Sequence, residues 1–210
     1  MDMSIPYEAT GRTRQKARTR TVLVAAARAL LAQGVTPTVE QAADAADVSR
    51  TTAYRYFPNQ RALIAATFPE VAADSLLPDS APDDPAARLA EVVRTLTSHV
   101  LEHEPELRAQ LRLSLEPDGA TDLPFRTGKA AAWLEEALAP LAGRFPAADL
   151  RRLVLAIRTA VGIEALVWLT DVAGLSRPEA VQLMRWSAEA LLRGATSRAS
   201  RGRPSPRAVP

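Results

Sequence analysis

The amino-acid sequence predicts an all-α protein of about nine helices, on three observations. Apolar residues recur at steps of three and four, as at Leu23, Ala27 and Leu30, which is the period of a helix with one buried face. Residues typical of helix N-caps precede such segments, and Gly or Pro follows them. The alternation of apolar and polar residues that would indicate strands is absent from the sequence. We therefore expect helices that pack only on other helices.

The composition is that of an ordinary globular protein, with 47% hydrophobic and 24% charged residues. No apolar run approaches the roughly 20 residues that a membrane-spanning helix needs, and residues 1–10 do not resemble a secretory signal. The absence of cysteine excludes disulfides, thiolate metal ligands and cysteine nucleophiles. We expect a cytoplasmic protein with no membrane partner.

The net charge of +2 conceals a strong asymmetry along the chain. Residues 1–61 carry nine basic and five acidic side chains, residues 62–192 carry twelve and nineteen, and residues 193–210 carry five and none. A basic N-terminal segment of residues 1–61 (the head), followed by an acidic segment of residues 62–192 (the body), indicates that the head binds nucleic acid. All but two of the basic residues are Arg, which favours bidentate contacts to phosphate and guanine.

The first predicted helix runs from Arg12 to Gln33, with Gly34 as its C-cap glycine, after a disordered N-terminus of residues 1–11. Its first turns carry five basic residues, which suit the phosphate backbone of DNA; the alternative is a solvated, charged helix end. These residues are Arg12, Arg14, Lys16, Arg18 and Arg20.

Residues 38–64 have the pattern of two short helices joined by a tight turn. Thr38 and Gln41 form a capping box at the start of the first, and Ser49 caps the second. The second helix then presents Arg, Thr and Tyr side chains, which are the types that hydrogen-bond to bases and phosphates in a DNA groove. The segment therefore predicts a helix-turn-helix and a DNA-binding regulator.

The helix-turn-helix domain is expected over residues 12–58, and a longer helical domain over 59–194. The tail 195–210, rich in Arg, Ser and Pro, cannot bury a core and is expected to be disordered. The later helices are predicted at about 59–77 with an interruption or kink at Pro69, 85–103, 105–117, 124–143, 147–173 and 176–194.

This plan resembles the tetracycline-repressor (TetR) family of bacterial transcriptional regulators. The resemblance rests on residues 12–64: the basic first helix, the capped second helix, and Val-Ser-Arg-Thr-Thr-Ala-Tyr-Arg-Tyr-Phe at 48–57, followed by Asn59-Gln60 and Leu63-Ile64. Beyond residue 64 only the all-helical plan is shared. The turn residue, often Gly in the family, is Asp47 here, and Asp tolerates a left-handed conformation better than most residues.

The resemblance implies roles for individual residues of the helix-turn-helix. Arg50, Thr51 and Arg55 are the implied base readers. For the two tyrosines the alternative role is packing against the first helix, and Tyr54 is preferred as the phosphate contact. The implied phosphate contacts are Thr38, Thr52, Tyr54, Tyr56 and Gln60. The core behind them is expected from Ala42, Ala43, Ala46, Val48, Ala53, Phe57 and Leu63.

The resemblance also implies a homodimer built from the last two helices, and the sequence supports it. The predicted helix 147–173 is apolar on two faces, and the last helix repeats this, so each can pack in its own domain and against a partner. The residues assigned to the dimer are Leu155, Gly162, Leu166, Leu169, Leu183, Trp186 and Ala190.

A dimer implies a double-stranded, pseudo-palindromic operator, and the resemblance implies a repressor released by an unknown small-molecule effector. An apolar pocket with few polar anchors is expected in the body. Glu164 is expected to point inward, toward an Arg such as Arg108 or Arg112, either as a ligand anchor or as a structural ion pair. The pocket residues are His99, His103, Leu107, Leu111, Phe125, Trp133, Glu164 and Trp168.

His99 and His103 lie one turn apart and suit a metal ion, but the sequence offers no clear third ligand. Satisfied core histidines are therefore preferred, and neither a metal nor another cofactor is expected. The main alternative function is an all-helical enzyme or small-molecule carrier without DNA binding. The sequence contains no Gly-rich phosphate loop, His-Glu-x-x-His motif or serine elbow, so an enzyme is not expected. A regulator that binds DNA without any ligand is the second alternative.

Overall fold

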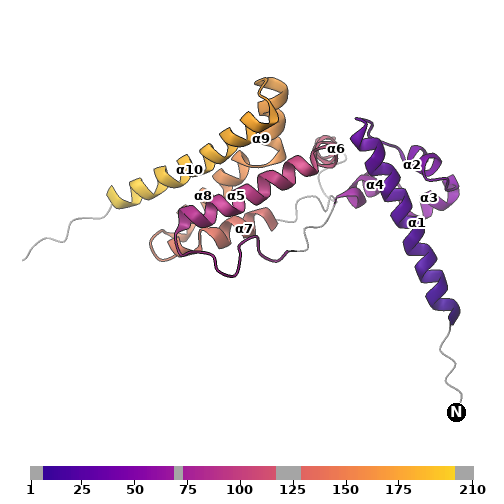
Figure 1. The fold of residues 1–210 in the computed structure, drawn as a ribbon, viewed down its shortest axis with the longest axis horizontal. Coiled ribbons are helices and arrows are strands. Elements are labelled where there is room, and N and C mark those ends of the chain that lie inside the picture. Colours follow the sequence, from indigo (N-terminus) through magenta and orange to yellow (C-terminus); the bar gives the residue numbers. More distant parts are fainter. Residues whose placement is uncertain (1–6, 69–72, 117–128, 202–210) are drawn as a thin grey trace, which may run out of the picture. The chain divides into compact units, whose positions relative to one another are not determined.

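The computed structural model describes residues 7–68, 73–116 and 129–201, and within them it contains helices and no strand. The all-α prediction is confirmed. The helices divide into two compact units (Figure 1), one of residues 1–70 with 105–125 and the other of residues 71–104 with 126–210.

The first unit holds the predicted helix-turn-helix. In it, α1 packs against α2 and α4, and α2 packs against α3 (Figure 1). The expected core is confirmed: Ala42, Ala43, Ala53, Phe57 and Leu63 are buried, with Ala46 and Val48 partly buried against them. The helices of this unit are α1 (Tyr7–Ala32), α2 (Val39–Ala45), α3 (Arg50–Tyr56), α4 (Gln60–Thr67) and, from Pro105 on, α6 (Glu104–Ser114).

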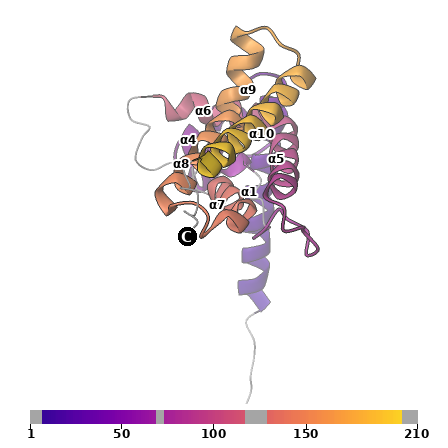
Figure 2. The same ribbon diagram turned by 90° about the vertical axis from the view of Figure 1, so that its left-hand side faces the viewer.

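The second unit is a bundle in which α10 lies beside α5 and α8, and α7 packs against the same two helices (Figures 1 and 2). Each helix contributes fully buried apolar side chains, among them Val92, Leu134, Ile157 and Met184. The elements are α5 (Pro85–Glu102), α7 (Lys129–Ala137), a 3₁₀ turn (Ala139–Leu141), α8 (Ala147–Ala160), α9 (Ile163–Val167), a π-helical turn (Trp168–Val172) and α10 (Arg177–Arg201).

Polar side chains cap the starts of several helices. The side chains of Asn59 and Asp84 accept hydrogen bonds from the N–H groups of Ala62 and Ala87 at 2.8 and 2.9 Å. Ser176 N–H donates to the Glu179 carboxylate at 2.9 Å, and Glu179 N–H donates to Ser176 Oγ at 3.4 Å, which forms a second capping box. Gly34 ends α1 with φ 80, the left-handed conformation that favours glycine.

The single helix predicted over 147–173 is wrong, because the chain breaks between α8 and α9. Gly162 is extended, with φ −93 and ψ 178, and the two segments are bent by 41°. Glycine is a poor helix former, so a break there costs little. The faces assigned on one continuous helix therefore do not hold beyond residue 161.

Several predicted helix ends were also wrong. α1 begins at Tyr7, so residues 7–11 are helical, and residues 1–6 lie outside the described part. α4 ends at Thr67, because Phe68 precedes Pro69 and is pushed to an extended conformation. α7 ends at Ala137, where Pro140 cannot continue the helix; the start expected near 124 lies outside the described residues.

The tail expected to be disordered from residue 195 is helical as far as Arg201, as the last turns of α10. Ala and Arg are good helix formers, and the first proline after them is Pro204. Residues 202–210 lie outside the described part.

Among the described residues, no single helix is both long and apolar enough to span a bilayer. Only α8 joined to α9 and its π-helical turn reaches that length and composition, as a bent pair.

Candidate nucleic-acid interface

The turn between α2 and α3 is a Schellman motif with an aspartate at its left-handed position. Asp47 has φ 52, as expected. The N–H of Val48 donates to the carbonyl of Ala43 at 2.9 Å, and that of Asp47 to the carbonyl of Asp44 at 3.3 Å. These two bonds satisfy the end of α2 and direct the chain into α3.

Capping fixes the start of both helices. Thr38 N–H donates to Gln41 Oε1 at 2.8 Å, and Gln41 N–H donates to Thr38 Oγ1 at 3.2 Å, which completes the predicted capping box. Ser49 Oγ accepts from the N–H of Thr52 at 3.3 Å at the start of α3. Both caps are local, so the sequence alone was sufficient to find them.

Helix α3 buries one face and exposes the other. Ala53 and Phe57 lie in the core of the first unit. The exposed side chains are those of Arg50, Thr51, Tyr54 and Arg55, with Thr52 and Tyr56 partly buried. A short helix that shows a row of Arg, Thr and Tyr to solvent is the arrangement that enters a major groove.

Two carboxylates of α2 hold side chains of this exposed face, and sequence reasoning missed both. The Tyr54 hydroxyl donates to Glu40, and Arg50 Nη2 lies 3.7 Å from Asp44 Oδ2. The hydrogen bond from Tyr54 lowers the pKa of Glu40 and raises the pKa of Tyr54. The spacing of Glu40 and Asp44 could have indicated these contacts, because residues four apart lie on one face of α2.

A groove of about 390 Å³ lies between α1 and α3 and is lined by polar and basic side chains. Three of its residues belong to α3 and were expected to contact DNA; the α1 residues Gln15 and Thr19 were not singled out, because only the charged residues of α1 were considered. Lys16 and Arg55 give the groove a positive charge suited to a phosphate. The lining residues are Gln15, Lys16, Thr19, Thr52, Arg55 and Tyr56.

Gln60 is used inside the first unit. Its Nε2 donates to the carbonyls of Thr36 and Pro37 at 3.3 and 3.0 Å, which fastens α4 to the loop before α2. Tyr56 is partly buried against the core, so it is the tyrosine that packs. The guanidinium of Arg20 lies 5.6 Å from the centre of the Phe57 ring, a cation–π contact.

The residues expected to line an effector pocket are divided between the two units. Leu107 and Leu111 belong to the first unit, the others to the second, and Phe125 lies outside the described residues. Trp133 is buried, with its indole N–H donating to the carbonyl of Asp74 at 3.2 Å. Trp168 is 58% exposed, since the break at Gly162 turns it outward.

Glu164 does not point inward, which corrects the expected pairing with Arg108 or Arg112. Its side chain is 42% exposed and lies 3.3 Å from Arg158 Nη1. The pair bridges the end of α8 and the start of α9 across Gly162. The helical wheel failed here because it assumed an unbroken helix.

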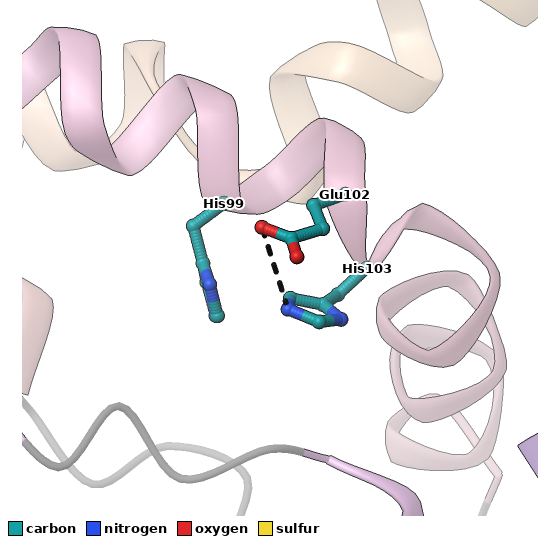
Figure 3. Close-up of side chains that lie close together, drawn as sticks. All are labelled: His99, Glu102 and His103. Carbon is teal, nitrogen blue, oxygen red and sulfur yellow. Dashed lines mark ion pairs between the residues drawn. The ribbon is translucent and has the colours of Figure 1, made fainter.

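His99 and His103 do lie together, at the end of α5 (Figure 3). Their ring centres are 4.5 Å apart in an edge-to-face arrangement. Burial lowers the pKa of His99, and the neighbouring His103 lowers it further. Glu102, which the sequence reasoning did not consider, lies beside them: His103 Nε2 is 3.9 Å from its carboxylate.

The residues assigned to the dimer fall into two groups. Leu166 and Leu169 are buried within the chain itself, as is Gly162, so they are not available to a partner. Leu155, Leu183 and Trp186 are exposed, and Ala190 is partly buried. Three further apolar side chains of the same helices and their connecting turn are exposed: Trp168, Val172 and Leu191.

Comparison with curated protein sequences gives no match. Among solved structures, the chain is similar to the crystal structure of a TetR-family transcriptional regulator from Streptomyces coelicolor. That similarity has 22% sequence identity and a TM-score of 0.45, and covers 85% of this chain and 98% of the other. Residues 22–67 match the family model of bacterial regulatory proteins, tetR family, and this range holds the C-terminal part of α1 and all of α2 to α4. These residues therefore form a DNA-binding helix-turn-helix domain of the type found in bacterial regulatory proteins of the tetR family, which indicates a transcriptional regulator.

Proposed function

We propose that the chain is a homodimeric repressor that binds a pseudo-palindromic DNA operator and is released from it by a small molecule. The observation that carries the proposal is the exposed face of α3, where Arg50, Thr51 and Arg55 stand on a helix anchored by Ala53 and Phe57. Such a helix presents base-reading side chains to the major groove while its buried face fixes their direction.

In the proposed complex, Arg50, Thr51 and Arg55 read base edges. Arg can bond to guanine through two N–H groups, which discriminates between base pairs. Thr38, Thr52 and Tyr54 contact phosphates. The groove between α1 and α3, with Lys16 and Arg55, takes a further phosphate of the same strand.

Glu40 and Asp44 modulate the affinity of this surface for DNA. Because the Tyr54 hydroxyl donates a hydrogen bond to Glu40, it must leave that carboxylate before it can donate to a phosphate. In the same way, Arg50 must leave its ion pair with Asp44 before it can bond to a base. Both acids also repel the DNA backbone, so they lower non-specific affinity and favour sites where the base contacts are complete.

The dimer is proposed to form through the apolar side chains exposed on α8, α10 and the turn after α9. Helices α8 and α10 pack against each other in the second unit, and neighbouring exposed Trp and Leu side chains indicate an interaction surface. A two-fold interface of this kind places two copies of α3 on successive half-sites of one operator. The dimer surface comprises Leu155, Trp168, Val172, Leu183, Trp186 and Leu191.

The effector is proposed to bind the second unit, which is compact and separate from the helix-turn-helix unit. A small molecule can release DNA only if it binds more tightly to the conformation that does not fit the operator. A regulator that binds DNA constitutively lacks this difference. A thermal-shift screen of the purified protein separates the two, because a ligand of the folded state raises the melting temperature.

The experiment that tests the DNA contacts compares Arg50→Ala with Arg144→Ala. Arg144 is an exposed arginine of the second unit, so its removal lowers the net charge equally without touching α3. We expect Arg50→Ala to weaken binding to a selected operator by about 1–3 kcal/mol per head and to relax sequence preference locally. Equal affinities of the two variants for the operator would contradict the assignment of α3.

A further inference from the structure

The end of α5 brings together three side chains that ligate metals. His99, Glu102 and His103 lie at positions i, i+3 and i+4, which places them on one face of the helix. One ligand atom from each lies within 4.8 Å of the other two. Figure 3 shows the carboxylate of Glu102 beside the His103 ring, with the His99 ring on the same side of the helix. These are the only two histidines of the chain, and it has no cysteine.

The spacing of the donors is close to that of a bound ion. A tetrahedral Zn²⁺ with bonds of about 2.0–2.2 Å needs donor atoms about 3.3 Å apart. His103 Nε2 and Glu102 Oε2 are already 3.9 Å apart. Because 73% of the Glu102 side chain is exposed, it can turn toward the rings without displacing packed neighbours. Since the three ligand atoms lie within 4.8 Å of one another, each pair has to approach by at most about 1.5 Å.

The surroundings favour a cation. His103 is the C-cap residue of α5, and the C-terminal end of a helix carries a partial negative charge. The next acid, Glu104, is held by Arg177 through bonds of 2.6 and 3.0 Å, so that carboxylate is committed elsewhere. The three ligands therefore form a separate group rather than part of the neighbouring ion pair.

We propose that His99, Glu102 and His103 bind one divalent transition-metal ion, with Zn²⁺ as the best fit. Two imidazoles and one carboxylate form a donor set that Zn²⁺ accepts readily, and two histidines four residues apart on a helix are a spacing that zinc sites use. Three protein ligands leave at least one coordination position for water or another donor. This site does not depend on DNA binding, and Glu102 is the third ligand that was not identified from the sequence.

The test is a titration of the full-length, untagged protein with Zn²⁺ by calorimetry, and with Co²⁺ by visible absorption. We expect one ion per chain, and loss of saturable binding in His103→Ala. Glu102→Gln should weaken binding at least about tenfold, since even outer-shell partners of metal ligands change affinity about 10–100-fold.

Glu91→Gln is the matched control, because Glu91 lies on the same helix eleven residues earlier, about 16 Å away. Its affinity for Zn²⁺ should equal that of the unchanged protein. Circular dichroism establishes that each variant is folded, and Glu102→Gln keeps the test valid if a histidine variant unfolds. Absence of one-to-one binding in the unchanged protein, or equal affinities of Glu102→Gln and Glu91→Gln, would overturn the proposal.

Discussion

Replacement of Trp186 by Arg is the sharpest perturbation of the proposed dimer surface. Trp186 exposes 59% of its surface in the single chain. A tryptophan side chain offers roughly 250 Å², so a partner can cover about 150 Å² of it, worth about 3–4 kcal/mol at about 25 cal/mol per Å². A two-fold interface contains the residue twice, which gives an upper value of about 7 kcal/mol.

Buried area overstates affinity, because association also costs rotational freedom and side-chain order. Even if only the contribution of one copy is realised, the dissociation constant rises more than about 100-fold, since about 1.4 kcal/mol is a factor of ten. We therefore expect Trp186→Arg to be monomeric at concentrations where the unchanged chain is a dimer. Sedimentation velocity over a dilution series measures this directly.

Leu115→Arg is the matched control. Leu115 is 75% exposed and belongs to the first unit, so it adds the same charge at an exposed apolar position outside the dimer surface. Its dissociation constant should equal that of the unchanged chain. A dimer that persists in Trp186→Arg, or that is lost in Leu115→Arg instead, would refute the assigned surface.

Three further predictions concern the first unit. Asp47→Gly should match or exceed the stability of the unchanged chain, and Asp47→Ala should fall below Asp47→Gly by about 1 kcal/mol in chemical denaturation, because only glycine adopts positive φ without cost; equal stabilities would contradict the left-handed turn. Glu40→Gln should raise affinity for any duplex about fourfold per head at low salt, as expected for losing a charge about 5 Å from a phosphate in water, and this gain should vanish at high salt. The hydrogen bond from Tyr54 lowers the pKa of Glu40, so the stability that this bond contributes is present at neutral pH and is lost as the pH falls and Glu40 becomes protonated. A Tyr54→Phe variant should therefore lose less stability over that pH range, and an acid transition identical to that of the unchanged chain would argue against the bond.

The helix-turn-helix could be predicted from the sequence because its determinants are local. Thr38, Ser49 and Asn59 cap helices through bonds that span three residues, and Asp47 takes its conformation from the turn it occupies. Small apolar residues at helical spacing were sufficient to identify the core that includes Ala42 and Ala53.

The second unit was predicted less well, because its site residues depend on where a helix breaks. A helical wheel carried through Gly162 placed Glu164 and Trp168 inside, while the bend places both outside. The same error assigned Leu166 to a partner, although it is fully buried in its own chain. The break could not be found from N-cap residues in the sequence, because α9 has no side-chain cap at its start.

Contacts between different helices were also not predicted from the sequence. The bond from Tyr54 to Glu40 joins residues 14 apart in sequence, so it follows only once α2 and α3 are placed together. Glu102 was overlooked for a different reason. Only the two histidines were considered as metal ligands, although the helical spacing of Glu102 already places it on the same face as both.

In the proposed complex, two copies of α3 read a specific DNA sequence symmetrically. Selection of bound duplexes from a random library by the purified protein, at moderate salt, tests it most directly. We expect an enriched palindrome whose half-sites are separated by about one helical turn of DNA or a multiple of it. The Arg50→Ala variant should give no enrichment at the positions that Arg50 contacts. Recovery of unenriched sequences by a folded protein, or of a single asymmetric site, would contradict it.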